Sequence, residues 1–220
     1  MKPANPSRAT RHYGLFDRLI MAVDGAVKGL GERPPTGVPS PADPLPDVPM
    51  SEADQRLSAA MMRVNHTGEV CAQALYSAQS AWATDPAVRA MLETAGAEEL
   101  AHLDWCAGRL AELHSHPSRL DPCWFAGAYA IGTAFAAVGD DWSMGFLDET
   151  ERQVVAHLDD HLGALPRTDR RSRAIVLQMQ RDEARHSVTA VRHGARPLPL
   201  PLRLLMKGQA AVMKAVAARI

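Results

Sequence analysis

The sequence predicts an all-α protein built around a bundle of four long helices. Two observations indicate this fold. Long segments with helical periodicity are separated by short turn signals, among them residues 84–86 and 166–169. Glu residues also lie at mirrored positions on either side of these two turns, which is typical of residues that face each other across an antiparallel helix pair. The 220 residues are enough for one domain with a well-buried core.

The predicted helices begin and end at recognisable signals. Acidic residues follow Ser51, where a helix N-terminus favours negative charge, and Pro86 suits the first turn of a helix. Residues 123–139 carry no charge and are predicted to form a further helix within a long connection, as in a bundle with one crossover. The four core helices are predicted over residues 51–83, 86–114, 142–164 and 170–193.

The most informative pattern is a Glu followed by a Glu-x-x-His motif, which occurs twice. The first Glu precedes its motif by 30 residues and the second by 32, and a turn lies near the middle of each interval. Glu and His three residues apart share one face of a helix, so both sets of side chains are expected to meet inside the bundle. The six candidate metal ligands are Glu69, Glu99, His102, Glu151, Glu183 and His186.

Apolar neighbours of Glu69 and Glu151 argue against the alternative that these residues lie on solvated helix faces. Buried carboxylates are costly unless they are paired or bound to metal. A Glu from each of two helices and a Glu-x-x-His from each of the other two form the ligand set of ferritin-like di-iron and di-manganese proteins. Four carboxylates neutralise two divalent ions, and the lack of thiolates argues against structural zinc. We therefore predict two iron ions per subunit, with manganese as an alternative.

Glu149 competes with Glu151 as a ligand, because the two point about 200° apart on a helix and only one can face the metals. The turn at residues 166–169 favours Glu151. A ligating His usually donates its second ring N–H to a carboxylate or a carbonyl, and Glu98 and Asp182 are the natural candidates because each precedes the Glu of a motif.

Four other side chains near the predicted centre are candidates for supporting roles. His66 is expected to be structural, although a proton shuttle is the alternative. Tyr76 is expected to pack in the core, with a redox role left open. His157 and His161 are expected to be exposed or to lie around the ligands.

Charge is distributed unevenly along the chain. Residues 1–31 carry a net charge of +3 and residues 196–220 carry +5, so the remainder carries −9 within a total of −1. An acidic core argues against a nucleic-acid partner, whereas basic ends suit an anionic lipid surface. Three Cys residues without a C-x-x-C pattern indicate a reducing compartment. No signal-peptide core is present, and no uncharged stretch reaches the roughly 20 residues that a bilayer-spanning helix needs.

The chain is predicted to comprise four parts. Amphipathic helices are expected at both ends, and basic residues beside apolar stripes favour contact with a membrane interface. The parts are a basic tail and amphipathic helix (1–31), an extended Pro-rich linker (32–50), the four-helix-bundle catalytic domain (51–195) and a basic amphipathic C-terminal helix (196–220).

Over residues 50–195 the sequence resembles the demethoxyubiquinone hydroxylase family of ubiquinone biosynthesis. The resemblance is carried by Asn65-His66-Thr67-Gly68-Glu69, by Glu98-Glu99-x-x-His102 and by Asp182-Glu183-x-x-His186. It implies a ferritin-like di-iron monooxygenase that uses O2 to hydroxylate the ring of a polyprenyl methoxy-methyl-benzoquinone or quinol. The six candidate residues match the family's iron ligands, with Glu99 and Glu183 as the bridging pair.

The resemblance also implies partners and a location. The substrate's tail stays in the bilayer, so the enzyme is expected to be peripheral on the cytoplasmic face of the cell's inner membrane, at an anionic surface. Accessory proteins of ubiquinone biosynthesis are possible partners, and nucleic acid is not expected. Because the sequence has no glycine motif for a nucleotide, an external electron donor is expected.

Three other functions were weighed. A ferritin-like catalase or ferroxidase would need no surface for an isoprenoid tail. A tRNA hydroxylase on the same fold is disfavoured by the acidic core. A non-enzymatic bundle that binds polyprenyl lipids is disfavoured by the intact set of six ligands.

Overall fold

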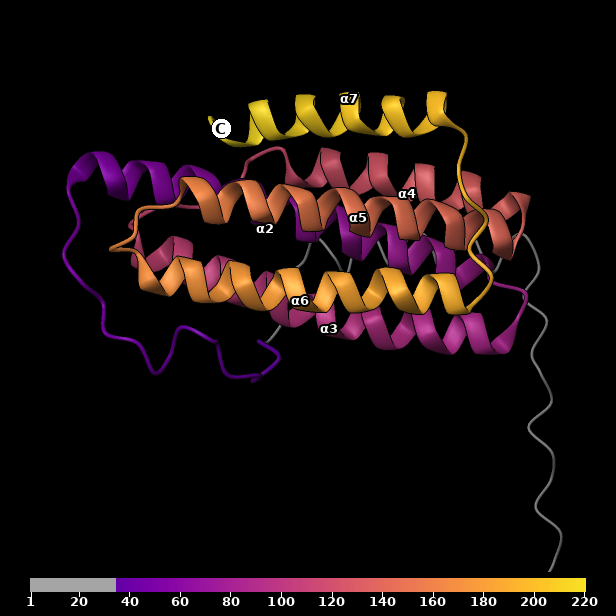
Figure 1. Ribbon diagram of the computed structural model, residues 1–220, viewed down its shortest axis with the longest axis horizontal. Coiled ribbons are helices and arrows are strands. Elements are labelled where there is room, and N and C mark those ends of the chain that lie inside the picture. The colour runs from indigo at the N-terminus through magenta and orange to yellow at the C-terminus, as the bar shows by residue number, and fades with distance from the viewer. Residues whose placement is uncertain (1–34) are drawn as a thin grey trace, which may run out of the picture.

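The computed structural model describes residues 35–220, and all regular secondary structure within this range is helical (Figure 1). The predicted basic tail and amphipathic helix (1–31) lie outside the described part of the chain. The described helices are α2 (Glu52–Trp82), α3 (Pro86–Glu112), α4 (Asp121–Val138), α5 (Asp140–Ala164), α6 (Arg170–Arg192) and α7 (Leu200–Ala217).

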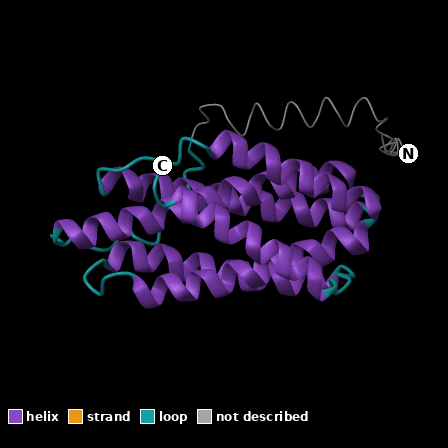
Figure 2. Ribbon diagram, turned by 90° about the horizontal axis from the view of Figure 1, so that it is seen from above, coloured by secondary structure: helices purple, strands orange, loops and turns teal. Residues whose placement is uncertain are grey.

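Helices α2, α3, α5 and α6 form the predicted four-helix bundle. α2 packs along α3, α5 packs along α6, and α3 also contacts α6. α4 lies in the crossover between the two pairs and packs against α2 and α5. Figure 2 shows the same helices from above, with loops at the ends of the bundle. This all-helical architecture confirms the predicted ferritin-like fold.

Side-chain caps explain why three bundle helices begin where the sequence predicted. Ser51 accepts a hydrogen bond from the backbone N–H of Asp54 at the start of α2. Asp85 caps α3 immediately before Pro86, and Asp169 caps α6. Each side chain satisfies a backbone N–H that has no partner within its helix. The first turns of the bundle are therefore set by local sequence.

Buried apolar side chains flank the predicted metal centre along the length of the bundle. On α2, Met62 belongs to one apolar cluster and Tyr76 to another, with Glu69 between them. On α3 the order is reversed, because Leu92 precedes the Glu-x-x-His motif and Leu110 follows it. The reversal matches the antiparallel course of the two helices. The polar centre therefore lies between two layers of buried apolar side chains.

The described part of the Pro-rich segment contains neither helix nor strand and makes a turn at residues 41–45, and residues 35–50 pack on the bundle instead of forming a free spacer. We call these residues the strap. The Thr36 backbone N–H donates to Asp104 of α3 over 2.7 Å, and Arg171 of α6 donates to the carbonyl of Leu45 over 2.6 Å. Prolines have no N–H to donate, so they predict an extended chain but not where it lies. The strap crosses α3 and α6.

Helix α7 lies within the predicted C-terminal segment (196–220) but differs from the prediction in its faces. It spans Leu200–Ala217. Leu202 and Met206 pack inward on an apolar cluster that joins side chains of α2, α4 and α5. A second set of apolar residues faces outward, whereas the sequence predicted only one apolar face. These exposed residues are Leu200, Leu204, Leu205 and Val212. None of the described helices is both long and apolar enough to cross a bilayer.

Candidate metal centre

The structure brings all six predicted ligands together in the centre of the bundle. α2 and α5 each supply one Glu, and α3 and α6 each supply a Glu-x-x-His motif. Two groups of side chains hold their ligand atoms within 4.8 Å of one another, as a metal ion would require. They are Glu69, Glu99, His102 and Glu183 in one group, and Glu151, Glu183 and His186 in the other.

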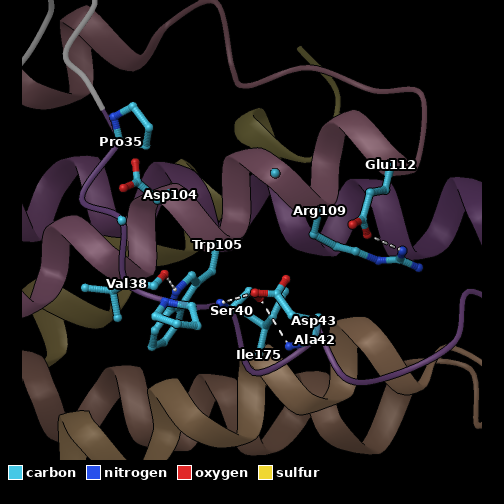
Figure 3. A pocket seen from close by; sticks show the side chains of 13 residues that line it. Pro35, Val38, Ser40, Ala42, Asp43, Asp104, Trp105, Arg109, Glu112 and Ile175 are labelled. Atoms are coloured by element: carbon cyan, nitrogen blue, oxygen red, sulfur yellow. Dashed lines mark hydrogen bonds and ion pairs between the residues drawn. The ribbon is translucent and has the colours of Figure 1, made fainter.

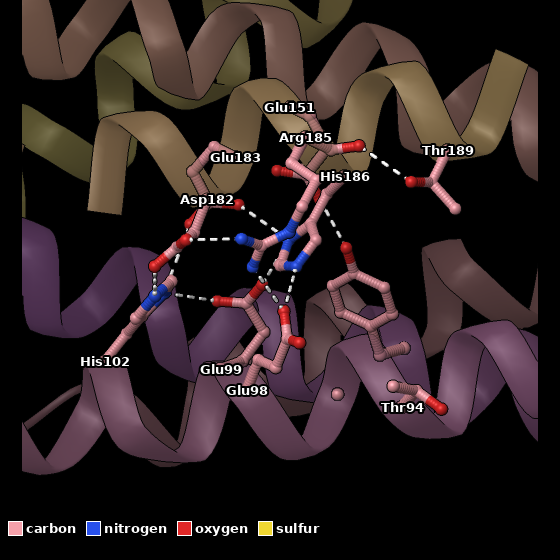
Figure 4. A network of polar contacts seen from close by, with 12 residues as sticks. Thr94, Glu98, Glu99, His102, Glu151, Asp182, Glu183, Arg185, His186 and Thr189 are labelled. Carbon is pink, nitrogen blue, oxygen red and sulfur yellow. Dashed lines mark hydrogen bonds and ion pairs between the residues drawn. The ribbon is translucent and has the colours of Figure 1, made fainter. Parts of the chain in front are cut away.

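Glu99 and Glu183 lie between the two histidines, as expected of bridging carboxylates (Figure 4). Glu99 places Oε2 2.9 Å from Nδ1 of His102 and Oε1 2.9 Å from Nδ1 of His186. Glu183 places Oε1 3.4 Å from the first Nδ1 and Oε2 3.2 Å from the second. Each carboxylate therefore directs one oxygen to each half of the centre.

The outward ring nitrogens of both histidines are held by the acidic residues that the sequence indicated. Nε2 of His102 lies 3.1 Å from Asp182, and Nε2 of His186 lies 2.8 Å from Glu98. Each histidine therefore contacts the acidic residue that precedes the Glu of the other motif. These two contacts hold α3 and α6 in a fixed relation at the centre. These contacts leave Nδ1 of each ring directed at the carboxylates. A partner of this kind fixes the orientation of a ligating imidazole.

Arg185 joins these two outer carboxylates, and the sequence reasoning missed it. Its guanidinium lies 2.8 Å from Glu98 and 3.0 Å from Asp182. Its side chain is 56% exposed, so the pairs are screened by solvent. The signal that could have revealed it is its place inside the second motif, where one helical turn separates it from Asp182.

Burial shapes the ionisation of the cluster. Burial raises the pKa of Glu69 and of Glu151, and neighbouring carboxylates raise both further. Burial alone would lower the pKa of His186, but hydrogen bonds to Glu183 and Glu99 raise it to about 11. The donor set therefore favours added positive charge. Oε2 of Glu69 is buried without a hydrogen-bond donor, so this oxygen is available to a metal ion. The residues fit a bound metal ion.

Glu151 faces the centre and Glu149 does not, as the mirrored spacing predicted. The Tyr76 hydroxyl donates to Oε1 of Glu151 over 2.9 Å. Glu149 instead accepts from Arg203 of α7 over 2.8 Å and from Gln153 over 2.7 Å. Tyr76 is therefore more than a packing residue, because its hydroxyl orients a candidate ligand.

His66, His157 and His161 lie outside the cluster. His66 pairs with Asp121 of α4 over 3.1 Å, in keeping with its predicted structural role. His157 and His161 lie side by side on α5, with ring centroids 3.9 Å apart. The prediction of an exposed side chain or one around the ligands was wrong for His161, which is 9% exposed and contacts no candidate ligand in the described contacts, whereas His157 is half-buried. Burial lowers the pKa of His157 to about 3 and that of His161 to about 4.

Fold and site together define the class of protein: a ferritin-like helical bundle with a buried carboxylate–histidine centre that can hold metal. Comparison with known families then narrows the class. The sequence profile described as "Ubiquinone biosynthesis protein COQ7" matches residues 56–217. The chain belongs to this family.

Similar curated proteins cover nearly the whole chain. One from Acidovorax sp. (strain JS42) is 54% identical over 205 residues, which are 93% of this chain and 100% of the relative. One from Xanthomonas euvesicatoria pv. vesicatoria (strain 85-10) is 48% identical over 211 residues, or 96% of this chain and 97% of the relative. Both relatives bear the name 3-demethoxyubiquinol 3-hydroxylase.

Proposed function

We propose that this protein is a 3-demethoxyubiquinol 3-hydroxylase that works with two iron ions and O2. The observation that carries the proposal is the arrangement of Glu99 and Glu183, each of which reaches both ligand histidines. Two carboxylates between two imidazoles suit a pair of ions better than a single one. The names of the relatives supply the reaction, the hydroxylation step of ubiquinone biosynthesis.

The proposed reaction replaces a ring C–H bond of the quinol with C–OH. One oxygen atom of O2 enters the ring and the other leaves as water, and the balance requires two electrons and two protons. Bound iron would supply the redox chemistry that activates O2. Manganese would fit the same ligands, and iron is favoured because its redox chemistry suits O2.

The protein's own residues position and protect the site. Tyr76 holds Glu151 through its hydroxyl, and Asp182 and Glu98 fix the two imidazole rings. Buried apolar side chains on both sides exclude water, as an O2-activating site requires. The electrons come from an external donor, since the sequence offers no glycine-rich nucleotide motif.

Location is part of the proposal. We place the enzyme at the cytoplasmic face of the inner membrane, bound peripherally, where its polyprenyl quinol substrate resides. The support is the outward apolar side of α7, on which Leu204 is 57% and Leu205 68% exposed. Lys207 and Arg219 supply positive charge that suits anionic lipid. Cys71, Cys106 and Cys123 are free thiols, in keeping with a reducing compartment. Accessory proteins of the pathway could share this surface.

Oxygen labelling tests the reaction. Iron-loaded protein is supplied with a chemical reductant, a demethoxyubiquinol and 18O2, and the product is analysed by mass spectrometry. We expect one 18O atom in the ring hydroxyl of each product molecule. Unlabelled product would show that the oxygen comes from water and contradict a monooxygenase. Oxidation of added iron without any ring product would favour the ferroxidase alternative.

A further inference from the structure

His157 and His161 form a pair of imidazoles on α5, away from the carboxylate–histidine cluster. They lie about one helical turn apart, and their ring centroids are 3.9 Å from each other. Nε2 of His157 and Nδ1 of His161 are buried, and neither has a hydrogen-bond partner among the described residues. Because a buried polar atom without a partner costs free energy, these two nitrogens are candidates for binding a ligand.

The side of α7 that adjoins α5 is basic. Arg203 pairs with Glu149 of α5 over 2.8 Å, which identifies this side of the helix. Helical spacing places Lys207 and Lys214 on the same side as Arg203. Glu149 neutralises the charge of Arg203, whereas neither lysine forms an ion pair within the described part of the chain. Two positive charges along this edge are therefore left without a carboxylate partner there.

Lys214 lies close enough to act on both imidazoles. Burial lowers the pKa of His157 to about 3 and that of His161 to about 4, and the Lys214 ammonium contributes to both shifts. The exposed Asp160 has a smaller and opposite effect on the pKa of His161. Both rings are therefore neutral near pH 7, and each has one N–H that can donate a hydrogen bond. Two imidazole donors beside an ammonium group suit an anion.

The polar groups at the cavity beside the strap, by contrast, are already paired within the protein. This cavity of about 430 Å³ lies between the strap and α3 (Figure 3). Arg109 there pairs with Glu112 over 2.7 Å and with Asp169 over 2.9 Å. Asp104 accepts hydrogen bonds from the backbone N–H and the hydroxyl of Thr36. The unpartnered nitrogens of the imidazole pair are therefore the clearer sign of a ligand.

The place of the pair beside α7 identifies the anion. Leu204 and Leu205 project from the outward side of α7, which the proposed location turns toward lipid, and they are 57% and 68% exposed. A basic residue at the flank of such a helix reaches the lipid phosphates while the apolar side chains enter the acyl region. Lys214 lies on this flank by helical spacing. Ala217 is the one buried residue of α7, so the helix rests on the bundle surface and its edge adjoins the headgroups.

We propose that His157, His161 and Lys214 form a binding site for the phosphate group of an anionic lipid, at the edge between α5 and α7. This inference rests on the proposed membrane location. The imidazoles donate hydrogen bonds to the phosphate oxygens, and the ammonium supplies the charge. The apolar side chains of α7 set how deeply the helix enters the bilayer. A localised phosphate contact also fixes how α5, and with it the bundle, is oriented on the membrane.

The test compares the double variant His157→Gln, His161→Gln with the wild type at pH 7. Sedimentation is measured with vesicles of phosphatidylcholine that contain phosphatidylglycerol, and with vesicles of phosphatidylcholine alone. Because both rings are neutral, the double variant keeps the net charge of the protein and its diffuse attraction to anionic lipid. We expect binding to the anionic vesicles to fall about tenfold or more through the lost hydrogen bonds, and binding to the neutral vesicles to stay unchanged.

Lys207→Gln is the matched control for charge. It removes one positive charge from the same side of α7, but Lys207 is not among the groups that shift the pKa of either imidazole. It should weaken binding to the anionic vesicles by about fivefold, as expected for one basic residue near a membrane, and Lys214→Gln should weaken it further. Equal losses for the two lysine variants would show that Lys214 contributes diffuse attraction and no site. Melting curves establish that each variant is folded.

Nuclear magnetic resonance of the wild type identifies the source of the phosphate. The 15N shifts of the His157 and His161 rings are recorded with inorganic phosphate, and with micelles of short-chain phosphatidylglycerol or phosphatidylcholine. We expect shifts with phosphatidylglycerol alone. Equal shifts with inorganic phosphate would show a site for the free anion and overturn the lipid assignment. Unchanged anionic-vesicle binding by the double variant would overturn the site, whereas a wild type that binds no vesicle would refute the membrane location itself.

Discussion

Replacement of Glu183 by Ala is expected to abolish hydroxylation and to prevent the binding of two iron ions. Glu183 belongs to both candidate ligand groups, and its two oxygens reach toward both histidines. Loss of a group that merely supports a ligand costs about 10–100-fold in metal affinity or activity, so loss of a shared ligand should exceed this range. Iron analysis of the purified variant and a quinol hydroxylation assay measure the two effects.

Glu149→Ala is the matched control. Glu149 is also a buried helical Glu, but it pairs with Arg203 and Gln153 instead of facing the centre. This variant should keep the wild-type iron content, and Glu151→Ala should lose iron. The opposite result, with Glu149 required and Glu151 dispensable, would show that the ligand on α5 has been assigned to the wrong residue.

The double variant Leu204→Asp, Leu205→Asp is expected to lose binding to lipid vesicles. Burial of a Leu side chain is worth about 1.5–3 kcal/mol, so removal of two such side chains should weaken partitioning by roughly 100-fold or more. Sedimentation with anionic vesicles measures this loss. Turnover of a long-tailed demethoxyubiquinol should fall with it, while turnover of a tail-less analogue should remain near wild type, because neither residue is near the metal centre.

Leu177→Asp provides the comparison, since Leu177 is also exposed, at 38%, but lies on α6. It should leave vesicle binding unchanged. Equal vesicle binding by the double variant and the wild type would show that α7 does not contact lipid. Equal losses for the long-tailed and the tail-less substrate would mean that the substitutions damage the fold and not the approach of the tail.

The bundle and the six clustered residues could be predicted because their signals are local or symmetric. Capping residues such as Ser51 and Asp85 mark where helices begin. The mirrored Glu positions indicate which residues meet across a turn. The choice of Glu151 over Glu149 followed from the same symmetry. Helical spacing fixes the face of a side chain whatever lies opposite, so these inferences needed no knowledge of tertiary contacts.

The features that the sequence did not reveal depend on contacts between distant segments. The strap packs on α3 and α6 through hydrogen bonds such as the one from Thr36 to Asp104. No periodic pattern in the sequence indicates these contacts. The role of Tyr76 depends on where α5 places Glu151. The inward packing of Leu202 and Met206 on α7 was missed because only docking decides which of two apolar sides faces the bundle.

The metal content of the protein tests the central proposal most directly. Purified protein would be loaded with ferrous iron without oxygen, freed of excess metal and measured for iron per chain, with Mössbauer spectra recorded before and after exposure to O2. The ligand set predicts two iron ions per chain that become a coupled diferric pair. Folded protein that hydroxylates its quinol without bound metal, or that holds a single ion whatever the supply, would contradict it.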